Sequence, residues 1–268
     1  ERNLGLVFQS YALWPHKTVF ENVAYPLKLR KVPTKEIQQR VQDVLDQLGL
    51  GHLGKRLPHQ LSGGQQQRIA LARALAPHPD ILLLDEPFSS LDEQLREQMR
   101  SFVQELHQRT QTTIVMVTHD REEALSMSDR IALMIDGQIV QVDVPEEIYR
   151  RPINKRVSDY FGGCSYLSGQ VRNGIFYHPV LQMPVSDYAD GDWVARILPG
   201  MVHLCEDGNW KVTKVCYQGE SSLVTLQRED SILTARVMEP PGVGKMCGVR
   251  VDAEELLLLK QEPCVHTK

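Results

Sequence analysis

Long hydrophobic runs and clustered positive charge are both missing from this 268-residue sequence. Apolar runs such as Ile131–Ile135 are far shorter than the roughly 18 residues of a membrane-spanning helix, so we predict no transmembrane segment here. Lys and Arg number 30 against 34 Asp and Glu, a net charge of −4. No basic stripe with interleaved aromatic residues stands out either, which argues against a nucleic-acid partner.

Paired cysteines are missing as well. The five cysteines, Cys164, Cys205, Cys216, Cys247 and Cys264, form no Cys-x-x-Cys pair, and their spacings suit neither a zinc site nor a disulfide framework. We therefore expect reduced thiols in a cytosolic protein. With 42% hydrophobic and 24% charged residues, the composition is that of a folded globular chain.

The first half of the sequence alternates short apolar strands with longer helical patterns. The predicted segments are strands at 4–8, 81–84 and 113–117, helices from 34 to 48, 63–76, 91–107 and 121–127, and a hairpin of 131–135 and 138–142 around Asp136-Gly137. The strands at 81–84 and 113–117 are apolar enough to predict burial on both faces. Alternating strands and helices predict an α/β domain.

The second half changes character after Phe161-Gly162-Gly163. Short β-rich segments separated by turns such as Asn173-Gly174 and Asp190-Gly191 predict a small barrel or sandwich. We place the boundary near residue 162, which gives an α/β domain over 1–161 and a small all-β domain, either an OB-like barrel or a sandwich, over 162–268. Oligonucleotide binding by such a barrel is disfavoured, because no basic surface pattern accompanies it.

Two carboxylates follow the apolar strand Ile81–Leu84 directly. Open α/β sheets bind ligands at the carboxyl ends of their strands, where Asp85 and Glu86 are expected to lie. A nucleotide hydrolase needs one carboxylate to hold Mg²⁺ and another to activate the attacking water. Asp85 fits the first role and Glu86 the second. The alternative is a strand that ends in a solvated acidic turn.

The string Leu61-Ser62-Gly63-Gly64-Gln65 precedes a helical pattern. Ser62 followed by two glycines leaves backbone N–H groups accessible at a helix N-terminus, where the helix dipole favours an anion such as a terminal phosphate. The alternative is an ordinary Ser N-cap. However, two glycines in the first turn of a helix lower the stability of that helix, and no nearby interaction compensates for the loss.

Three further features are weak individually. His119 follows the strand 113–117 and is a candidate polar clamp on a phosphate, although a single His after a strand is usually structural. Gln9 follows the strand 4–8, where a polar strand end is the alternative. Ser89-Ser90-Leu91-Asp92 alone indicates a helix N-cap.

In this order and spacing, the motifs resemble those of the ATP-hydrolysing subunits of ATP-binding-cassette (ABC) transporters, over residues 1 to about 161. The resemblance implies that Gln9 is the Q-loop glutamine, Leu61–Gln65 the signature motif, Ile81–Glu86 the Walker B segment, Ser89–Asp92 the D-loop and His119 the switch histidine. It implies an incomplete P-loop NTPase fold with a helical subdomain, Glu86 and His119 as catalytic residues, and Mg²⁺ held by Asp85 and Gln9. The implied ATP-contacting residues are Gln9, Ser62, Gly63, Gly64, Gln65, Asp85 and Asp92.

The finer resemblance is to importer subunits that carry a C-terminal β domain called TOBE. It rests on the strings 7–16 and 145–149 and on Arg151-Pro152 leading into Asp159–Gly162, with Trp14 where the group usually has Phe. Members serve spermidine or putrescine, ferric iron, sulfate, molybdate, phosphonates or maltose. The implied location is peripheral, on the cytoplasmic face of the inner membrane.

The implied partners are membrane permease subunits, a second ATP-binding subunit and, indirectly, a solute-binding protein. Between Gln9 and Ser62, the helical subdomain of the family receives a short permease helix. The candidate contact residues are Tyr11, Leu13, Trp14 and His16, because aromatic residues are favoured interface anchors. Internal packing of these side chains is an equally weighted alternative.

A phosphate loop, Gly-x-x-x-x-Gly-Lys followed by Ser or Thr, does not occur in these residues. The near match Gly49–Lys55 follows a helical pattern and is succeeded by Arg56, so we interpret it as a helix end and loop. In the family this loop and an adenine-stacking aromatic precede the Q-loop. We therefore expect them to precede Glu1, in an N-terminally truncated sequence that is inactive by itself.

Three functions compete at this point. The leading one is an importer ATPase subunit that couples ATP hydrolysis to solute import. The second is a non-catalytic fragment or decoy that binds the permease or a complete subunit. The third, a soluble cassette protein of DNA repair or translation, is disfavoured because the expected coiled-coil or tandem-cassette insertions are missing and the tail is β-rich.

Overall fold

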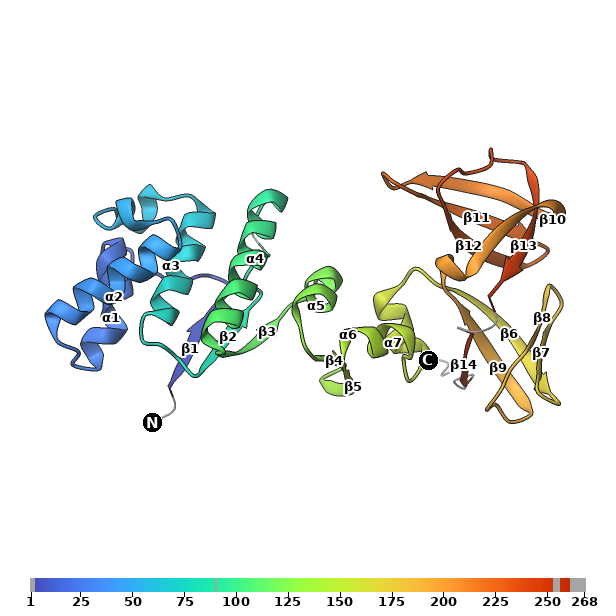
Figure 1. Ribbon diagram of the computed structural model, residues 1–268, viewed down its shortest axis with the longest axis horizontal. Coiled ribbons are helices and arrows are strands. Elements are labelled where there is room, and N and C mark those ends of the chain that lie inside the picture. Colours follow the sequence, from blue (N-terminus) through green and yellow to red (C-terminus); the bar gives the residue numbers. More distant parts are fainter. Residues whose placement is uncertain (1–2, 90, 253–255, 261–268) are drawn as a thin grey trace, which may run out of the picture. The chain divides into compact units, whose positions relative to one another are not determined.

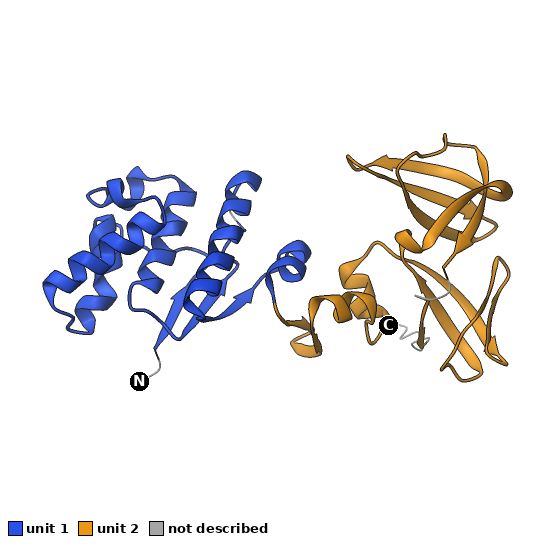
Figure 2. Cartoon of the chain, in the orientation of Figure 1, with its two compact units in different colours: residues 1–128 blue, residues 129–268 orange. Residues whose placement is uncertain are grey.

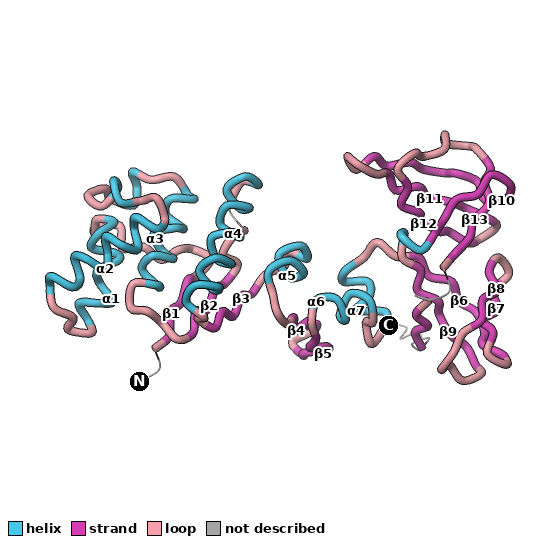
Figure 3. Tube along the Cα trace, in the orientation of Figure 1, coloured by secondary structure: helices cyan, strands magenta, loops and turns pink. Residues whose placement is uncertain are grey.

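The computed structural model describes residues 3–89, 91–252 and 256–260. They divide into two compact units, residues 1–128 and 129–268 (Figure 2). Helices dominate the first unit and strands the second (Figure 3). No described helix is long and apolar enough to cross a membrane. Four of the cysteines are free thiols, whereas Cys264 and the D-loop residue Ser90 lie outside the described residues.

Unit 1 combines a parallel sheet with surrounding helices (Figure 1). The strands are β1 (Leu4–Val7), β2 (Ile81–Asp85) and β3 (Thr113–Val117), in the order β1-β2-β3. The helices are α1 (Val19–Leu29), α2 (Thr34–Gln47), α3 (Gly63–Leu75), α4 (Glu93–Thr110) and α5 (Arg121–Met127), with 3-10 turns η1 (Gly51–Leu53) and η2 (Pro58–Gln60). The three predicted strands and four predicted helices are confirmed, and α1 is added to them.

Local capping explains where these helices begin. Ser62 caps α3 and Asp92 caps α4, each accepting a hydrogen bond from the backbone N–H three residues later. Because Asp92 caps the helix, α4 begins at Glu93 rather than at the predicted Leu91. The Gly49–Lys55 string follows α2 and contains η1, which confirms that it is a helix end and loop.

One face of the sheet in unit 1 is packed and the other is exposed. Leu82 and Leu84 are buried in the core with residues of α1, α2 and α3. In contrast, Val115 and Val117 on β3 are 51% and 58% exposed, and Ile81 on β2 is also exposed. The prediction that these strands are buried on both faces is therefore wrong. Apolar composition shows that both faces suit burial, but the neighbouring elements decide whether both are covered.

Unit 2 begins with a hairpin and two short helices. These are β4 (Ile131–Ile135), β5 (Gln138–Asp143), α6 (Pro145–Arg150) and α7 (Lys155–Phe161). Asp136 and Gly137 between the strands have φ of 51° and 75°, and positive φ at both central residues is what the predicted type I′ turn requires.

Two antiparallel sheets follow and share one core. One sheet has the order β14-β9-β6-β7-β8 and the other β12-β11-β10-β13. Their bounds are β6 (Ser165–Arg172), β7 (Ile175–His178), β8 (Leu181–Pro184), β9 (Gly191–Ile197), β10 (Val202–Tyr217), β11 (Ser222–Arg228), β12 (Ser231–Val237), β13 (Met246–Val251) and β14 (Leu257–Lys260), with the 3-10 turn η3 (Pro199–Met201). Val171, Phe176, Val212 and Leu226 are fully buried in the core. The expected β-rich region is therefore present.

A buried arginine joins the two short helices to these sheets. Arg196 on β9 is 2% exposed. Its Nε donates to Ser158 Oγ on α7 at 2.7 Å, and its Nη2 donates to the Tyr149 carbonyl on α6 at 2.8 Å. A third hydrogen bond goes to the carbonyl of Arg150. These bonds attach α6 and α7 to the sheets of unit 2, which begins at residue 129, whereas the sequence places the domain boundary near 162.

Replacing Arg196 with Met is expected to lower the free energy of unfolding of unit 2 by about 3 kcal/mol, because a buried hydroxyl and two part-buried carbonyls lose their donor at once. In a Trp14→Phe background, Trp193 and Trp210 fluorescence reports unit 2 alone during urea unfolding. The exposed Arg236 provides the matched control, Arg236→Met, with an expected change within about 0.5 kcal/mol. Equal stability of the two variants would contradict the assigned role.

Candidate functional site

The parallel register of unit 1 brings the ends of its three strands together. Val7 pairs with Leu84, and Asp85 pairs with Val117. Gln9 follows β1 by two residues, Glu86 follows β2 directly, and His119 follows β3 by two residues. Three polar side chains from distant parts of the sequence therefore meet at one edge, where open α/β sheets bind ligands.

Glu86 is the centre of this group. Gln9 Nε2 donates to Glu86 Oε2 at 2.8 Å, and His119 Nδ1 lies 3.3 Å from Glu86 Oε1. One carboxylate is thus flanked by both neighbours predicted for this site. Its side chain is 28% exposed, so water can reach it. A carboxylate held in this way can orient a water molecule and accept its proton.

The backbone holds Glu86 in an unusual conformation. Its φ is 45°, in the left-handed region that residues with a Cβ rarely adopt. The Glu86 N–H donates to the Val117 carbonyl at 2.9 Å, and Ser89 Oγ donates to the Glu86 carbonyl at 3.1 Å. These bonds fix the turn after β2. Backbone strain of this kind is typical of functional sites.

A small cavity of about 80 Å³ lies beside the carboxylate. Its lining is formed by Glu86, Ser89, Arg96, Thr118, His119, Asp120 and Glu123. A polar cavity of this volume is large enough for ordered water. The sequence analysis identified only Glu86, Ser89 and His119 among these residues.

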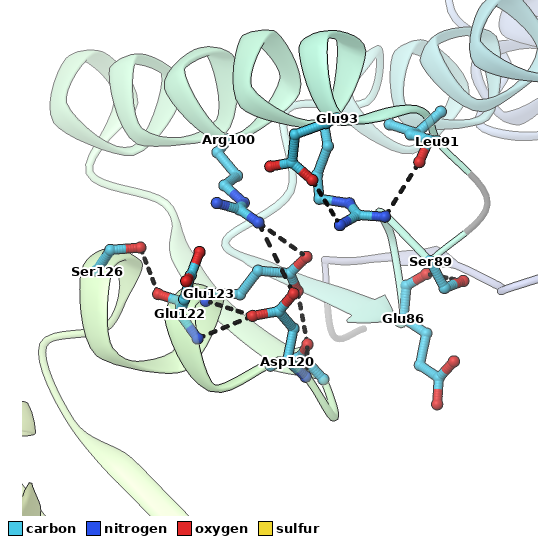
Figure 4. Close-up of polar contacts among 11 residues, drawn as sticks. Glu86, Ser89, Leu91, Glu93, Arg100, Asp120, Glu122, Glu123 and Ser126 are labelled. Atoms are coloured by element: carbon cyan, nitrogen blue, oxygen red, sulfur yellow. Dashed lines mark hydrogen bonds and ion pairs between the residues drawn. The ribbon is translucent and has the colours of Figure 1, made fainter. Parts of the chain in front are cut away.

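Behind the cavity, α4 is connected to the start of α5. Arg100 Nη2 lies 3.8 Å from Asp120 Oδ2 and 3.9 Å from Glu123 Oε1 (Figure 4). Glu123 also accepts a hydrogen bond from Thr118 Oγ1, and Asp120 caps α5. The chain around His119 is therefore anchored on both sides. In the sequence, Arg96 and Arg100 lie four positions apart in a predicted helix, and Thr118-His119-Asp120 follows a predicted strand. Neither pattern indicates which residues these side chains contact.

The Ser62–Gln65 string forms a capping box. Ser62 Oγ accepts from the Gln65 N–H at 3.3 Å, and Gln65 Oε1 accepts from the Ser62 N–H at 3.1 Å. A Cβ on Gly64 would collide with the Leu95 side chain, whereas a Cβ on Gly63 would have nothing within 4 Å. Gly64 thus has a packing role, and Gly63 leaves open space at the N-terminus of α3.

The described residues do not join this string to the Glu86 group. No hydrogen bond or ion pair among them connects Ser62–Gln65 with Gln9, Glu86 or His119.

Asp92 accepts from the Leu95 N–H at 2.9 Å as the cap of α4. Asp85 ends β2 with an exposed side chain. Over the described part of the chain, no three His, Cys, Asp or Glu side chains gather as a metal site.

The four candidate contact residues divide between internal packing and exposure. Tyr11 and Leu13 are half-buried against the core of unit 1. The Trp14 ring lies 4.4 Å from the Tyr25 ring, centroid to centroid. His16 is exposed. Internal packing therefore applies to Tyr11, Leu13 and Trp14, and contact of these residues with a permease stays a prediction.

Comparison with known proteins agrees with this geometry. The family described as ABC transporter matches residues 1–89. The glucose import ATP-binding protein GlcV of Saccharolobus solfataricus is 39% identical over 241 residues, which are 86% of this chain and 68% of that protein. The chain belongs to the ABC transporter family.

Other members of this family are more similar over shorter stretches. The sulfate/thiosulfate import ATP-binding protein CysA of Vibrio cholerae is 46% identical over 193 residues, 70% of this chain and 51% of that protein. The spermidine/putrescine import ATP-binding protein PotA of Thermotoga maritima is 47% identical over 171 residues, 64% of this chain and 46% of that protein. The matches to these two relatives thus span about half of their length.

Proposed function

We propose that this chain is part of an importer's ATP-binding subunit, in which ATP hydrolysis drives solute import. The observation that carries the proposal is the Glu86 carboxylate, held between Gln9 and His119 at the ends of three parallel strands. In this proposal Glu86 accepts the proton of the attacking water, and His119 contacts the terminal phosphate.

The residues around Glu86 fit a nucleotide-bound Mg²⁺. Asp85 presents an exposed carboxylate at the end of β2. Because the Gln9 amide N–H donates to Glu86, its amide oxygen is proposed to bind the cation. Oxygen ligands of this type suit Mg²⁺, which when bound neutralises charge on the phosphates. Asp85 and Gln9 are the proposed Mg²⁺ ligands.

The remaining assignments follow from the family and from the relatives' names. Ser62, Gly63, Gly64 and Gln65 are proposed to contact ATP bound to a second subunit, and Asp92 of the D-loop segment is proposed to contact ATP as well. Residues 162–268 are proposed to form a TOBE domain. Permease subunits, contacted by Tyr11, Leu13, Trp14 and His16, and a solute-binding protein would complete a transporter whose ATP-binding part lies on the cytoplasmic face of the membrane. CysA, PotA and GlcV import different solutes by name, so we assign none to this chain.

The signature motif can be tested separately from the Glu86 group. The chain is mixed with a complete cassette subunit, such as the Thermotoga maritima relative, whose own signature is inactivated by substitution. That subunit supplies the phosphate loop, which these 268 residues lack, and this chain supplies Leu61–Gln65. We expect ATP hydrolysis above the sum of the two separate proteins. A mixture with no gain would contradict the proposal and favour a non-catalytic fragment.

Gly63→Asp is expected to reduce that gain at least about tenfold, because a carboxylate would occupy the open space at the α3 N-terminus and repel a phosphate. The matched control is Gly242→Asp, since Gly242 is equally open but lies in unit 2. Phosphate release from ATP is the measurement. Equal activity of the two variants would remove Gly63 from the site.

A further inference from the structure

The segment that follows Gln9 has an unusual backbone. Tyr11 and Ala12 have φ of 60° and 46°, so two consecutive residues with a Cβ lie in the left-handed region. This region is disfavoured by contacts of the Cβ, and single residues enter it more readily than pairs. Such a backbone persists only when surrounding groups hold it. The segment between β1 and α1 therefore needs a specific restraint.

Arg73, near the end of α3, supplies that restraint. Its Nη1 donates to the Ala12 carbonyl at 2.7 Å, and its Nη2 donates to the Tyr11 carbonyl at 2.8 Å. The two nitrogens thus hold the two left-handed residues at once. A guanidinium suits this task because its donors form a rigid planar fork.

The Trp14 ring completes the environment of the guanidinium. Arg73 Cζ lies 4.8 Å from the centroid of that ring, within the range of a cation–π contact. Burial lowers the pKa of Arg73, yet an arginine stays charged at neutral pH. In the described part of the chain, carbonyls and an aromatic face stabilise this cation, and no ion pair to a carboxylate is recorded for it.

Asn22 on α1 fixes the far end of the segment. It is fully buried, accepts from the Trp14 N–H at 2.9 Å, and donates to the carbonyls of Trp14, Lys17 and Thr18. At the near end, Gln9 is bonded to Glu86. The stretch that Arg73 holds therefore lies between a fixed anchor on α1 and the carboxylate of the candidate active site.

We propose that Arg73 is a positioning residue, which clamps the Tyr11–Ala12 backbone to α3 and thereby holds Gln9 against Glu86. The same helix begins at Ser62, the cap of the signature motif. Movement of α3 would pull on the Tyr11 and Ala12 carbonyls and so reach Gln9. The catalytic meaning of this clamp rests on the function proposed above for Glu86, whereas the clamp itself does not.

The clamp is tested by amide hydrogen exchange on the whole chain, without nucleotide. The Tyr11 and Ala12 N–H groups donate to the carbonyls of Phe8 and Ser10, so they report the local backbone. We expect their exchange to accelerate at least about tenfold in Arg73→Met and at least about threefold in Arg73→Lys, because lysine cannot hold both carbonyls in a fork. Exchange at Ile69–Ala72 should stay unchanged.

Arg68→Met is the matched control. Arg68 also lies on α3 and donates to a backbone carbonyl, that of Leu48 at 3.3 Å. Its loss should leave exchange at Tyr11 and Ala12 unchanged. The clamp is overturned if the loop amides of Arg73→Lys exchange at the original rate, or if they accelerate only together with all of unit 1.

ATP hydrolysis by a form of this protein that carries a phosphate loop then tests the link to Gln9. We expect Arg73→Lys to lower kcat about tenfold and to change KM for ATP less than about twofold, because a displaced Gln9 affects the chemical step more than binding. If Arg73→Lys hydrolyses ATP at the original rate although the Tyr11 and Ala12 amides exchange faster, the positioning role is overturned. Absence of hydrolysis in the unsubstituted form that carries a phosphate loop would refute the proposed function, while the exchange data would still decide the clamp.

Discussion

Glu86→Gln is expected to reduce ATP hydrolysis by about 10²- to 10⁴-fold in a complete form of this protein that carries a phosphate loop, while leaving ATP binding intact. The substitution keeps the size of the side chain and an oxygen that can accept from Gln9 Nε2. It removes the basic carboxylate that the proposal uses to take a proton from water, and general bases contribute rate factors of this size. Phosphate release and equilibrium ATP binding are measured on the same preparation.

Glu97→Gln provides the control, because Glu97 is an exposed carboxylate on α4 outside the Glu86 group. It should hydrolyse ATP at the original rate. Retained hydrolysis in Glu86→Gln would remove Glu86 from the role of base. Loss of both binding and hydrolysis would instead show that the substitution disturbs the fold around the strained backbone at this residue.

Gly208→Ala is expected to destabilise unit 2 by about 3 kcal/mol, which lowers its midpoint of thermal unfolding by roughly 10 °C. Gly208 lies on β10 between Cys205 and Trp210, where the register with β13 shifts. A Cβ there would lie 2.3 Å from Gly248 Cα and 2.7 Å from the Cys247 carbonyl oxygen. Both obstacles are backbone atoms, so the two strands would have to separate.

Gly242→Ala is the matched control, since a Cβ at Gly242 has nothing within 4 Å. It should leave thermal unfolding within about 2 °C of the original, as surface substitutions generally do. Fluorescence of Trp193 and Trp210 in the Trp14→Phe background follows unit 2 in both variants. Equal midpoints would show that the strands tolerate a methyl group at the bulge.

Local structure was largely predictable from the sequence. The Ser62 N-cap and the Asp136-Gly137 turn were recognised from a few neighbouring residues, and the structure has both. Interactions within one helical turn or one hairpin depend on side chains that are close in the sequence whatever the rest of the chain does. The start of α4 shifted because Asp92 caps the helix, and several other element ends also differ from the predicted ones.

The candidate site was predictable as a set of residues but not as a geometry. The order of its motifs indicated the family, and that family is now shown. The sequence did not place Gln9 on Glu86, 77 positions away, nor did it indicate that Arg100 contacts Asp120 and Glu123, which line the same cavity as His119. Those contacts depend on the parallel order of β1, β2 and β3.

The sequence by itself therefore determined the elements, the caps and the identity of the chemical groups. Only the tertiary structure decided which face of the sheet is exposed, that Glu86 has a left-handed backbone, and that Arg73 holds the carbonyls of Tyr11 and Ala12. The physical reason is the separation along the sequence over which each kind of interaction acts. Propensity and capping act over three or four residues, whereas strand order and side-chain contacts join residues dozens of positions apart and exist only after the chain has folded.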